Sequence, residues 1–317
     1  MSITCGVPQG SVLGPLLFII YVNDLSSCLD NTHAIQFADD TTVYIRGNNI
    51  PSLYVRMNAD LCELTDWFYS NKLSLNVSKT NYMLFTKSRS IYSNEENLKM
   101  ANIVINRTPC FKLLGVHIDE QLSWNHHIKY CHSKLRSAHY AFNKVKYVVP
   151  SDCLRMLYYS LVYPHLTYGI ILWGSTYDTY IHKLFVAQKK IIRSMSRATY
   201  YEHCHPLFCN LKLLKLEDIY QLEVCKFMFK YVNNALPKQL CNIFKRTSVI
   251  HAYGTRQTTH LRSYKARTNV VTNSILCNGP VMWNKLHNHS KTLPHIRNFT
   301  SATRRDILLR YRRSVDT

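Results

Sequence analysis

The sequence is short of acidic residues and has no long apolar run. Its 317 residues include 39 lysines and arginines but only 19 aspartates and glutamates. The longest apolar run, residues 15–22, is far too short to span a bilayer, and residues 1–4 lack the basic segment of a secretory signal peptide. We therefore expect an intracellular protein, in the cytoplasm and nucleus, that is neither secreted nor embedded in a membrane.

The cysteines follow no pattern typical of disulfide-bonded or zinc proteins. There are 11 of them, an odd number, and none forms a C-x-x-C pair. Free thiols in a reducing compartment are the plain interpretation. His203, Cys204, His205 and Cys209 form one dense patch, but no second half lies at zinc-finger spacing. Because a structural zinc site needs four ligands, we do not predict zinc there.

The positive charge is concentrated in the second part of the chain. Residues 1–130 carry 10 lysines and arginines and 11 acids, whereas residues 131–317 carry 29 and 8. In that part the cations are dispersed among many tyrosines. Such a surface binds polyanions, since cations meet phosphates and aromatic rings meet bases. Nucleic acid is the favoured ligand, and the alternative is a basic helical surface without a specific ligand.

Two adjacent carboxylates, Asp39 and Asp40, stand between two β-prone stretches in the segment Phe37-Ala38-Asp39-Asp40. The pattern predicts a hairpin turn. Neighbouring side chains of an extended chain point to opposite faces, so one carboxylate can bind a cation while the other supports it. Clustered hard oxygen ligands suit Mg²⁺ or Mn²⁺. Taken by itself, however, the pair is more typical of a solvated turn than of a metal site.

The elements around this hairpin predict an α+β domain. Before it, Ser11 is placed to cap a helix that carries the apolar run, and the loop of residues 6–11 could let a phosphate or a base approach the backbone. A purely packing role is the alternative for this loop. After the hairpin, apolar residues recur at helical spacing over residues 51–69. Strands are expected near residues 82–85, 103–105 and 111–118.

From residue 124 onward the sequence predicts helices. An apolar seam marks residues 124–148 as a long packing helix, and further helices are expected over residues 153–163, 177–195 and 216–232. From about residue 250 the composition is polar and irregular, up to a last arginine-rich helix. Five basic residues lie on or near the third helix: Lys183, Lys189, Lys190, Arg193 and Arg197. We expect them to grip a nucleic-acid backbone, with a solvated helix face as the alternative.

Four ordered motifs make the chain similar to one family, the reverse transcriptases of non-LTR retrotransposons, which are LINE-like and include the jockey-type elements. The segment GVPQGS at residues 6–11, with the helix after it, resembles motif B of that family. FADD at residues 37–40 resembles motif C, and LSLNVSKT at residues 73–80 resembles motif D. FKLLGVHID at residues 111–119 resembles the primer-grip element. Together the motifs favour a metal site over a solvated turn at the carboxylate pair.

The resemblance implies roles for individual residues. In this family nucleotidyl transfer uses two divalent cations held by carboxylates, Mg²⁺ or Mn²⁺, with dNTPs as substrates and an RNA template and DNA primer as partners. Asp39 and Asp40 would be catalytic metal ligands, and Lys79 a catalytic residue near the leaving phosphate. Leu114 and Gly115 would be the primer grip. Four residues would form the nucleotide and template site: Pro8, Gln9, Gly10 and Phe37.

The resemblance also implies a domain order. It implies a partial palm over residues 1–122, a basic, thumb-like helical region over residues 123–200 and a basic helical or irregular C-terminal region over residues 201–317. The family's further catalytic aspartate, in motif A, and its fingers have no counterpart in the sequence. We therefore expect a reverse transcriptase segment without polymerase activity by itself. The alternatives are a catalytically inactive nucleic-acid-binding protein and a relic without function.

Overall fold

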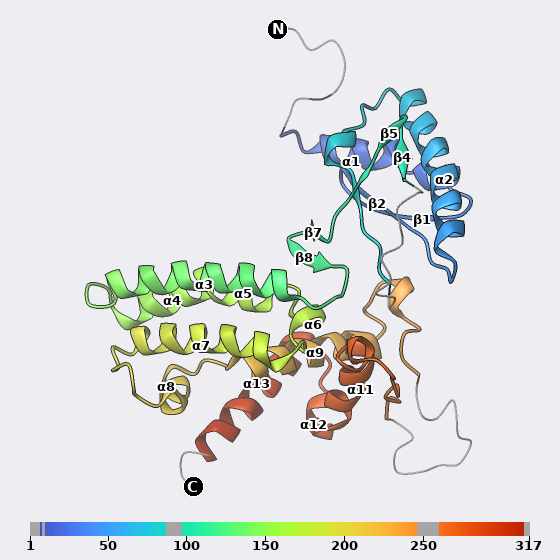
Figure 1. Ribbon diagram of the computed structural model, residues 1–317. Helices are drawn as coiled ribbons and strands as arrows, with labels where there is room; N and C mark the ends of the chain where they lie inside the picture. The colour runs from blue at the N-terminus through green and yellow to red at the C-terminus, as the bar shows by residue number, and fades with distance from the viewer. Residues whose placement is uncertain (1–6, 8–9, 87–96, 246–259, 314–317) are drawn as a thin grey trace, which may run out of the picture. The chain divides into compact units, whose positions relative to one another are not determined.

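The computed structural model describes residues 7, 10–86, 97–245 and 260–313 of the chain. The chain divides into two compact units, Met1–Pro109 and Cys110–Thr317 (Figure 1). The described part of the first unit combines helices with short strands, and that of the second has one hairpin followed by helices. The mixed α and β character that the sequence predicts is thus confirmed.

The first unit contains the hairpin and a long helix. Strands β1 (His33–Phe37) and β2 (Asp40–Tyr44) pair antiparallel. Helix α1 (Leu13–Tyr21) precedes them and α2 (Ile50–Ser70) follows. Short 3₁₀ turns cover Leu25–Cys28 and Val77–Lys79. Two further strand pairs complete the described part: β3 (Asn81–Tyr82) parallel with β6 (Asn106–Arg107), and β4 (Lys99–Met100) antiparallel with β5 (Ile103–Val104).

Helix α2 forms because its start is capped and one of its faces is apolar. The side chain of Asn49 accepts a hydrogen bond from the Ser52 amide at 3.4 Å, and Pro51 lies in the first turn, where its missing N–H is not needed. Leu61 and Leu64 are buried on its inner face. They belong to a small apolar core with four other buried residues: Leu25, Leu98, Met100 and Ile105.

Asp60 is a polar exception on the buried face of α2, since only 2% of its surface is exposed. Its carboxylate accepts hydrogen bonds of 2.7–2.9 Å from the backbone amides and the side chains of both Asn31 and Thr32. Burial acts to raise the pKa of Asp60, but these hydrogen bonds outweigh it and hold the pKa below its ordinary value. Asp60 therefore fixes the residues that enter β1 against α2.

Helix α1 differs from the usual amphipathic helix because none of its residues is buried, although almost all are apolar. Leu13, Leu16 and Ile20 are 60%, 54% and 63% exposed. The hydroxyl oxygen of Ser11 accepts a hydrogen bond from the Gly14 amide at 3.0 Å, as a helix cap does, but the helix itself begins two residues later at Leu13. The sequence places this start correctly to within that distance.

The second unit begins with the hairpin of β7 (Cys110–Leu113) and β8 (Val116–Asp119). Helix α3 (Asn125–Val145) then packs along α7 (Asp178–Met195), as Figure 1 shows. The seam predicted for residues 124–148 is confirmed, because Ile128, Leu135 and Phe142 are at most 2% exposed. The remaining helices up to residue 232 are α4 (Ser151–Leu161), α5 (Tyr163–Thr167), α6 (Ile170–Trp173), α8 (Cys204–Leu211) and α9 (Leu216–Val232).

The C-terminal residues are more helical than their irregular sequence predicts. A 3₁₀ turn at Lys238–Leu240 is followed by α10 (Asn269–Thr272), α11 (Ile275–Asn284), α12 (Asn288–Lys291) and α13 (Ile296–Arg313). Helix α11 packs so closely on α9 that a Cβ atom at Gly279 would lie only 2.7 Å from the sulfur of Met228. Such short helices are held by tertiary contacts, which a search for periodicity does not detect.

Two further observations concern the described helices and cysteines. None of these helices has both the length and the apolar character that crossing a membrane requires. Cys131, Cys204 and Cys225 are buried free thiols. Burial raises the pKa of Cys131 and of Cys225 to about 12, so these two side chains stay protonated and act as small apolar residues.

Candidate active site and nucleic-acid interface

The carboxylate pair lies at the tip of the β1–β2 hairpin, which confirms the predicted turn. Because Phe37 pairs with Asp40, the connection consists of two residues, Ala38 and Asp39. Ala38 has a φ of 52°, in the left-handed region that a tight two-residue hairpin uses. Asp39 and Asp40 are both exposed. The hairpin therefore presents two adjacent acidic side chains to solvent.

Hydrogen bonds connect this hairpin and the two helices around it within the first unit. The side-chain amide of Gln36, on β1, donates to the carbonyl of Val22 at 3.4 Å, just after α1. The hydroxyl of Tyr21, at the end of α1, donates to the carbonyl of Asn71 at 2.5 Å, just after α2. Together with the contacts of Asp60, these bonds tie α1, the hairpin and α2 to one another.

The donor set at the hairpin tip fits a hard cation in kind but is incomplete. Carboxylate oxygens are the ligands that Mg²⁺ and Mn²⁺ prefer, and both metals take six. Within the described ranges, no group of three or more His, Cys, Asp or Glu side chains is placed to hold a metal ion. Asp39 and Asp40 could therefore hold a cation only together with oxygen ligands from elsewhere, such as the phosphates of a nucleotide.

The other residues predicted for the first unit lie in separate segments. Lys79 ends the 3₁₀ turn after α2, where its amide donates to the carbonyl of Asn76 at 3.1 Å, and its side chain is exposed. Phe37 is 64% exposed and is brought beside the carboxylates by its pairing with Asp40. Gly10 has a φ of 86° and is exposed, whereas Pro8 and Gln9 lie outside the described residues.

Leu114 and Gly115 form the turn of the β7–β8 hairpin in the second unit. Both have positive φ, 45° and 86°. The hydroxyl of Tyr168 donates a hydrogen bond to the carbonyl of Leu114. A Cβ atom at Gly115 would lie 3.3 Å from the Tyr168 ring, so the absence of a side chain there lets the ring approach the turn. The predicted primer-grip residues are thus held in one conformation by a residue that the sequence did not single out.

Asp119 ends β8 and organises the connection to α3. It is 6% exposed. Its carboxylate accepts hydrogen bonds from the amides of Gln121, Ser123 and Trp124 at 3.2, 2.9 and 2.8 Å. These bonds satisfy backbone donors just before α3, where α-helices leave their first N–H groups unpaired. Asp119 is therefore a structural residue of the second unit.

The five basic residues predicted to contact nucleic acid divide into three groups. Lys189 and Arg193 line a pocket beside α8. Lys183 and Lys190 are exposed. Burial lowers the pKa of His132 on α3, and the positive charges of these two lysines lower it further. Arg197 donates to the carbonyls of Lys146 and Val149, at 2.9 and 3.3 Å, and so binds the end of α3. Part of the predicted set is thus engaged in holding the helices together.

Exposed tyrosines accompany the cations of the second unit, which carries 31 lysines and arginines against 10 acids. Tyr140, Tyr147 and Tyr200 are 66–72% exposed. Each has a cation near its ring, at 5.5, 5.1 and 6.0 Å from the ring centroid. The predicted combination of cations with aromatic rings is therefore present on the described surface. For Tyr140 and Tyr147 the sequence already indicates the contact, because the lysine lies four residues or one residue away in the chain.

An exposed carboxylate pair on a hairpin and a basic helical unit with surface tyrosines are features of proteins that act on nucleic acids. Comparison with known protein families narrows this class of proteins. Residues 1–118 match the family model described as "Reverse transcriptase (RNA-dependent DNA polymerase)". Residues 1–118 are therefore similar to the reverse transcriptases, and the relatives described next are polymerases of mobile elements.

The relatives extend the similarity beyond that segment. The "RNA-directed DNA polymerase from mobile element jockey" of Drosophila melanogaster is 24% identical over 79% of this chain and 28% of the relative. The "Probable RNA-directed DNA polymerase from transposon X-element" of the same organism is 26% identical over 68% of this chain and 24% of the relative. Both matches are longer than residues 1–118, so they include part of the second unit. The chain spans about a quarter of the length of these relatives. No solved structure matches it.

Proposed function

We propose that the chain is part of a reverse transcriptase that synthesises DNA on an RNA template. The observation that supports this most directly is the exposed pair Asp39 and Asp40 at the tip of a two-residue hairpin, inside the segment that matches the family. The ligands of this proposal are an RNA template, a DNA primer and dNTPs, with Mg²⁺ or Mn²⁺ as cofactor.

In the proposed reaction, each of the predicted site residues would have a separate role. Asp39 and Asp40 would hold the divalent cations through their carboxylate oxygens. When bound, such cations lower the pKa of the primer 3′-hydroxyl and stabilise charge on the pyrophosphate leaving group. Lys79 contributes a positive charge near the leaving phosphate. The turn of Leu114 and Gly115 orients the primer terminus, and the basic second unit binds the template–primer backbone.

In this proposal residues 1–122 are the later part of a palm, residues 123–200 a thumb-like region and residues 201–317 a basic C-terminal region. The compact units divide earlier, between Pro109 and Cys110. The hairpin of β7 and β8 packs with α3 in the second unit. Because the proposed primer-grip turn belongs to the helical unit, the primer terminus and the primer backbone would be bound by the same unit.

Primer extension tests the polymerase proposal. The chain is joined to the preceding palm and fingers of a jockey-type polymerase, and extension of a DNA primer on an RNA template is measured with and without Mg²⁺. We expect Mg²⁺-dependent extension that Asp39→Ala abolishes. Asp66→Ala is the matched control, since Asp66 is an exposed acid that belongs to α2 and not to the hairpin. Extension that persists in the Asp39 variant would contradict the assignment.

A second candidate function is nucleic-acid binding without catalysis. It is favoured by the excess of cations in the second unit and by the incomplete metal-ligand set in the described residues. In that case the chain by itself binds RNA with a steep dependence on salt, and Asp39→Ala leaves this binding unchanged. A chain that neither extends a primer nor binds RNA would be the relic without function.

A further inference from the structure

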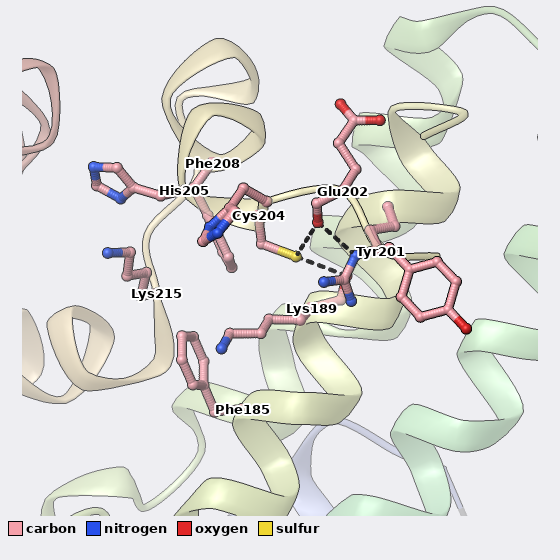
Figure 2. A pocket seen from close by; sticks show the side chains of 10 residues that line it. Phe185, Lys189, Tyr201, Glu202, Cys204, His205, Phe208 and Lys215 are labelled. Carbon is pink, nitrogen blue, oxygen red and sulfur yellow. Dashed lines mark hydrogen bonds between the residues drawn. The ribbon is translucent and has the colours of Figure 1, made fainter. Parts of the chain in front are cut away.

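A pocket of about 320 Å³ lies between α7 and α8 in the second unit (Figure 2). This size falls at the low end of small-ligand pockets, which measure about 300–1,000 Å³. Its lining includes three cations, Lys189, Arg193 and Lys215, and three aromatic residues, Phe185, Tyr201 and Phe208. We call it the α7–α8 pocket. Its lining combines cations with aromatic rings, so its chemistry differs from that of an apolar packing defect.

The cations of the α7–α8 pocket are only partly balanced by carboxylates. Within the described residues the salt bridge is that of Lys226 and Glu223 on α9, so Lys189, Arg193 and Lys215 form no salt bridge in that part of the chain. Glu202 is the acid in the lining. Its carboxylate accepts a hydrogen bond from the Thr199 amide at 3.3 Å, and in Figure 2 it points away from Lys189.

A further acid, Asp218, interacts with Lys215 and His205 of the lining. Its carboxylate accepts a hydrogen bond from the hydroxyl of Tyr311, and its charge is partly offset by Lys215. Helix α8 adds positive potential, because its N-cap residue, His203, makes no side-chain cap and its first turn holds no acid. The pocket is thus a positively charged cavity with free capacity for an anion.

Aromatic rings stand on the walls and at the edge of the pocket. Phe185 and Phe208 stack at 6.3 Å between ring centroids, and the ammonium of Lys189 lies 4.2 Å from the centroid of Phe185. Tyr201 is 90% exposed. In Figure 2, Lys215 and His205 lie on one side of the pocket and Tyr201 on the other. A ligand with a phosphate and a flat ring would match both sides at once.

We propose that the α7–α8 pocket binds one nucleotide of a single strand of RNA, with its phosphate at Lys189 and Lys215 and its base stacked on Tyr201. Stacking on a surface tyrosine and cation–phosphate contact are the two interactions that bind single strands without sequence preference. The proposal rests on the proposed nucleic-acid binding of the second unit and assigns it a defined subsite. Arg193 has a positioning role, since it donates to the carbonyl of Glu202 at 3.0 Å and so holds the loop that carries Tyr201.

Fluorescence anisotropy with the full chain tests the subsite. The probe is a short, fluorescein-labelled oligouridylate. We expect Tyr201→Ala to weaken binding about ten-fold, the loss typical of one stacked base. Tyr69→Ala, at a tyrosine that is 64% exposed on α2 of the first unit, serves as the control and is expected to change binding less than about three-fold. Because Tyr201 is almost fully exposed, its replacement leaves the fold intact.

Two double variants that remove lysine charges test the proposed phosphate contacts. Lys189→Gln with Lys215→Gln is compared with Lys72→Gln with Lys99→Gln, which removes the same charge at exposed positions of the first unit. We expect the pocket pair to lower the salt slope of binding by about 0.7 per lost contact, and to lose about ten-fold in affinity against less than about three-fold for the control pair. Equal losses in the two pairs together with equal losses in the two tyrosine variants would overturn the proposal.

The outcomes separate the subsite from the function on which it rests. If the unmodified chain binds no oligouridylate, the proposed nucleic-acid binding itself fails. If it binds and the pocket variants behave like their controls, only the subsite fails. Competition with uridine monophosphate distinguishes the source of the nucleotide, because displacement at the concentration that the unlabelled oligouridylate needs would show a site for a free nucleotide and overturn the assignment to a strand.

Discussion

The hydroxyl of Tyr168 donates a hydrogen bond to the backbone carbonyl of Leu114, a residue 54 positions earlier in the chain. The contact joins the loop after α5 to the turn of the β7–β8 hairpin. The carbonyl of Tyr168 in turn accepts a hydrogen bond from the indole of Trp173 at 3.0 Å, and Trp173 is fully buried. The turn proposed as the primer grip is thus supported by the core of the helical unit.

Removing this support should loosen the turn. Tyr168→Phe keeps the ring but deletes the hydroxyl, so we expect the second unit to lose about 1 kcal/mol of unfolding free energy. Denaturant unfolding measures the loss, and faster amide hydrogen exchange at Gly115 and Val116 would place it at the turn. Tyr177→Phe provides a control at another exposed tyrosine. Unchanged exchange at the turn in Tyr168→Phe would contradict the supporting role.

Gly115→Ala should be more harmful than its small size suggests. At a φ of 86° an alanine is strained, and its Cβ atom would lie 3.3 Å from the Tyr168 ring. We expect a loss of about 1–3 kcal/mol in unfolding free energy. Leu114→Ala, at the exposed neighbouring position, keeps its Cβ atom and is expected to lose less. Thermal unfolding compares the two variants, and equal losses would show that φ at Gly115 is not limiting.

Asp60→Asn should destabilise the first unit. The buried carboxylate accepts four hydrogen bonds, of which the amide can replace only part, so we expect a loss of about 2–4 kcal/mol. Because the folded pKa of Asp60 lies below its ordinary 3.8, the stabilisation is present above that pH and is lost as the pH falls through the folded value. Asp66→Asn is the exposed control. A variant that unfolds with unchanged pH dependence would refute this account.

Acid should destabilise the second unit through His127. Burial and the neighbouring His117 lower the pKa of His127 to about 4, and its Nδ1 accepts a hydrogen bond from the His117 amide at 3.3 Å, which requires the neutral ring. The unfolded chain binds this proton near pH 6.5, so stability falls between about pH 6.5 and 4, by on the order of 2 kcal/mol. Unfolding measured over this range should show less pH dependence in His127→Phe than in His126→Gln, an exposed control.

Replacing Arg197 should lower the stability of the second unit, whereas replacing both Lys183 and Lys190 should not. Arg197→Gln removes hydrogen bonds to two carbonyls at the end of α3, and we expect about 1 kcal/mol of lost stability. Replacing Lys183 and Lys190 by Gln should leave stability within about 0.5 kcal/mol, because both side chains are exposed. Denaturant unfolding of the two variants, run side by side, decides whether Arg197 acts as a structural residue.

The sequence by itself determined the elements whose signal is local. Helix α9 lies at the predicted residues 216–232, and α2, α3 and α7 fall within a few residues of their predicted ranges. Apolar spacing records which face of a helix is buried, whatever it is buried against. The tight turn at Asp39 and the division of charge along the chain are equally local properties.

Only the tertiary structure decided which side chains share a surface. It separated Lys189 and Arg193 from Lys183 and Lys190, directed Arg197 to backbone carbonyls, and placed Tyr168 against Leu114. It also placed α11 against α9, where Gly279 closely approaches Met228. These contacts join residues that lie tens of positions apart, and no local pattern encodes the partner because the partner is set by how the whole unit packs.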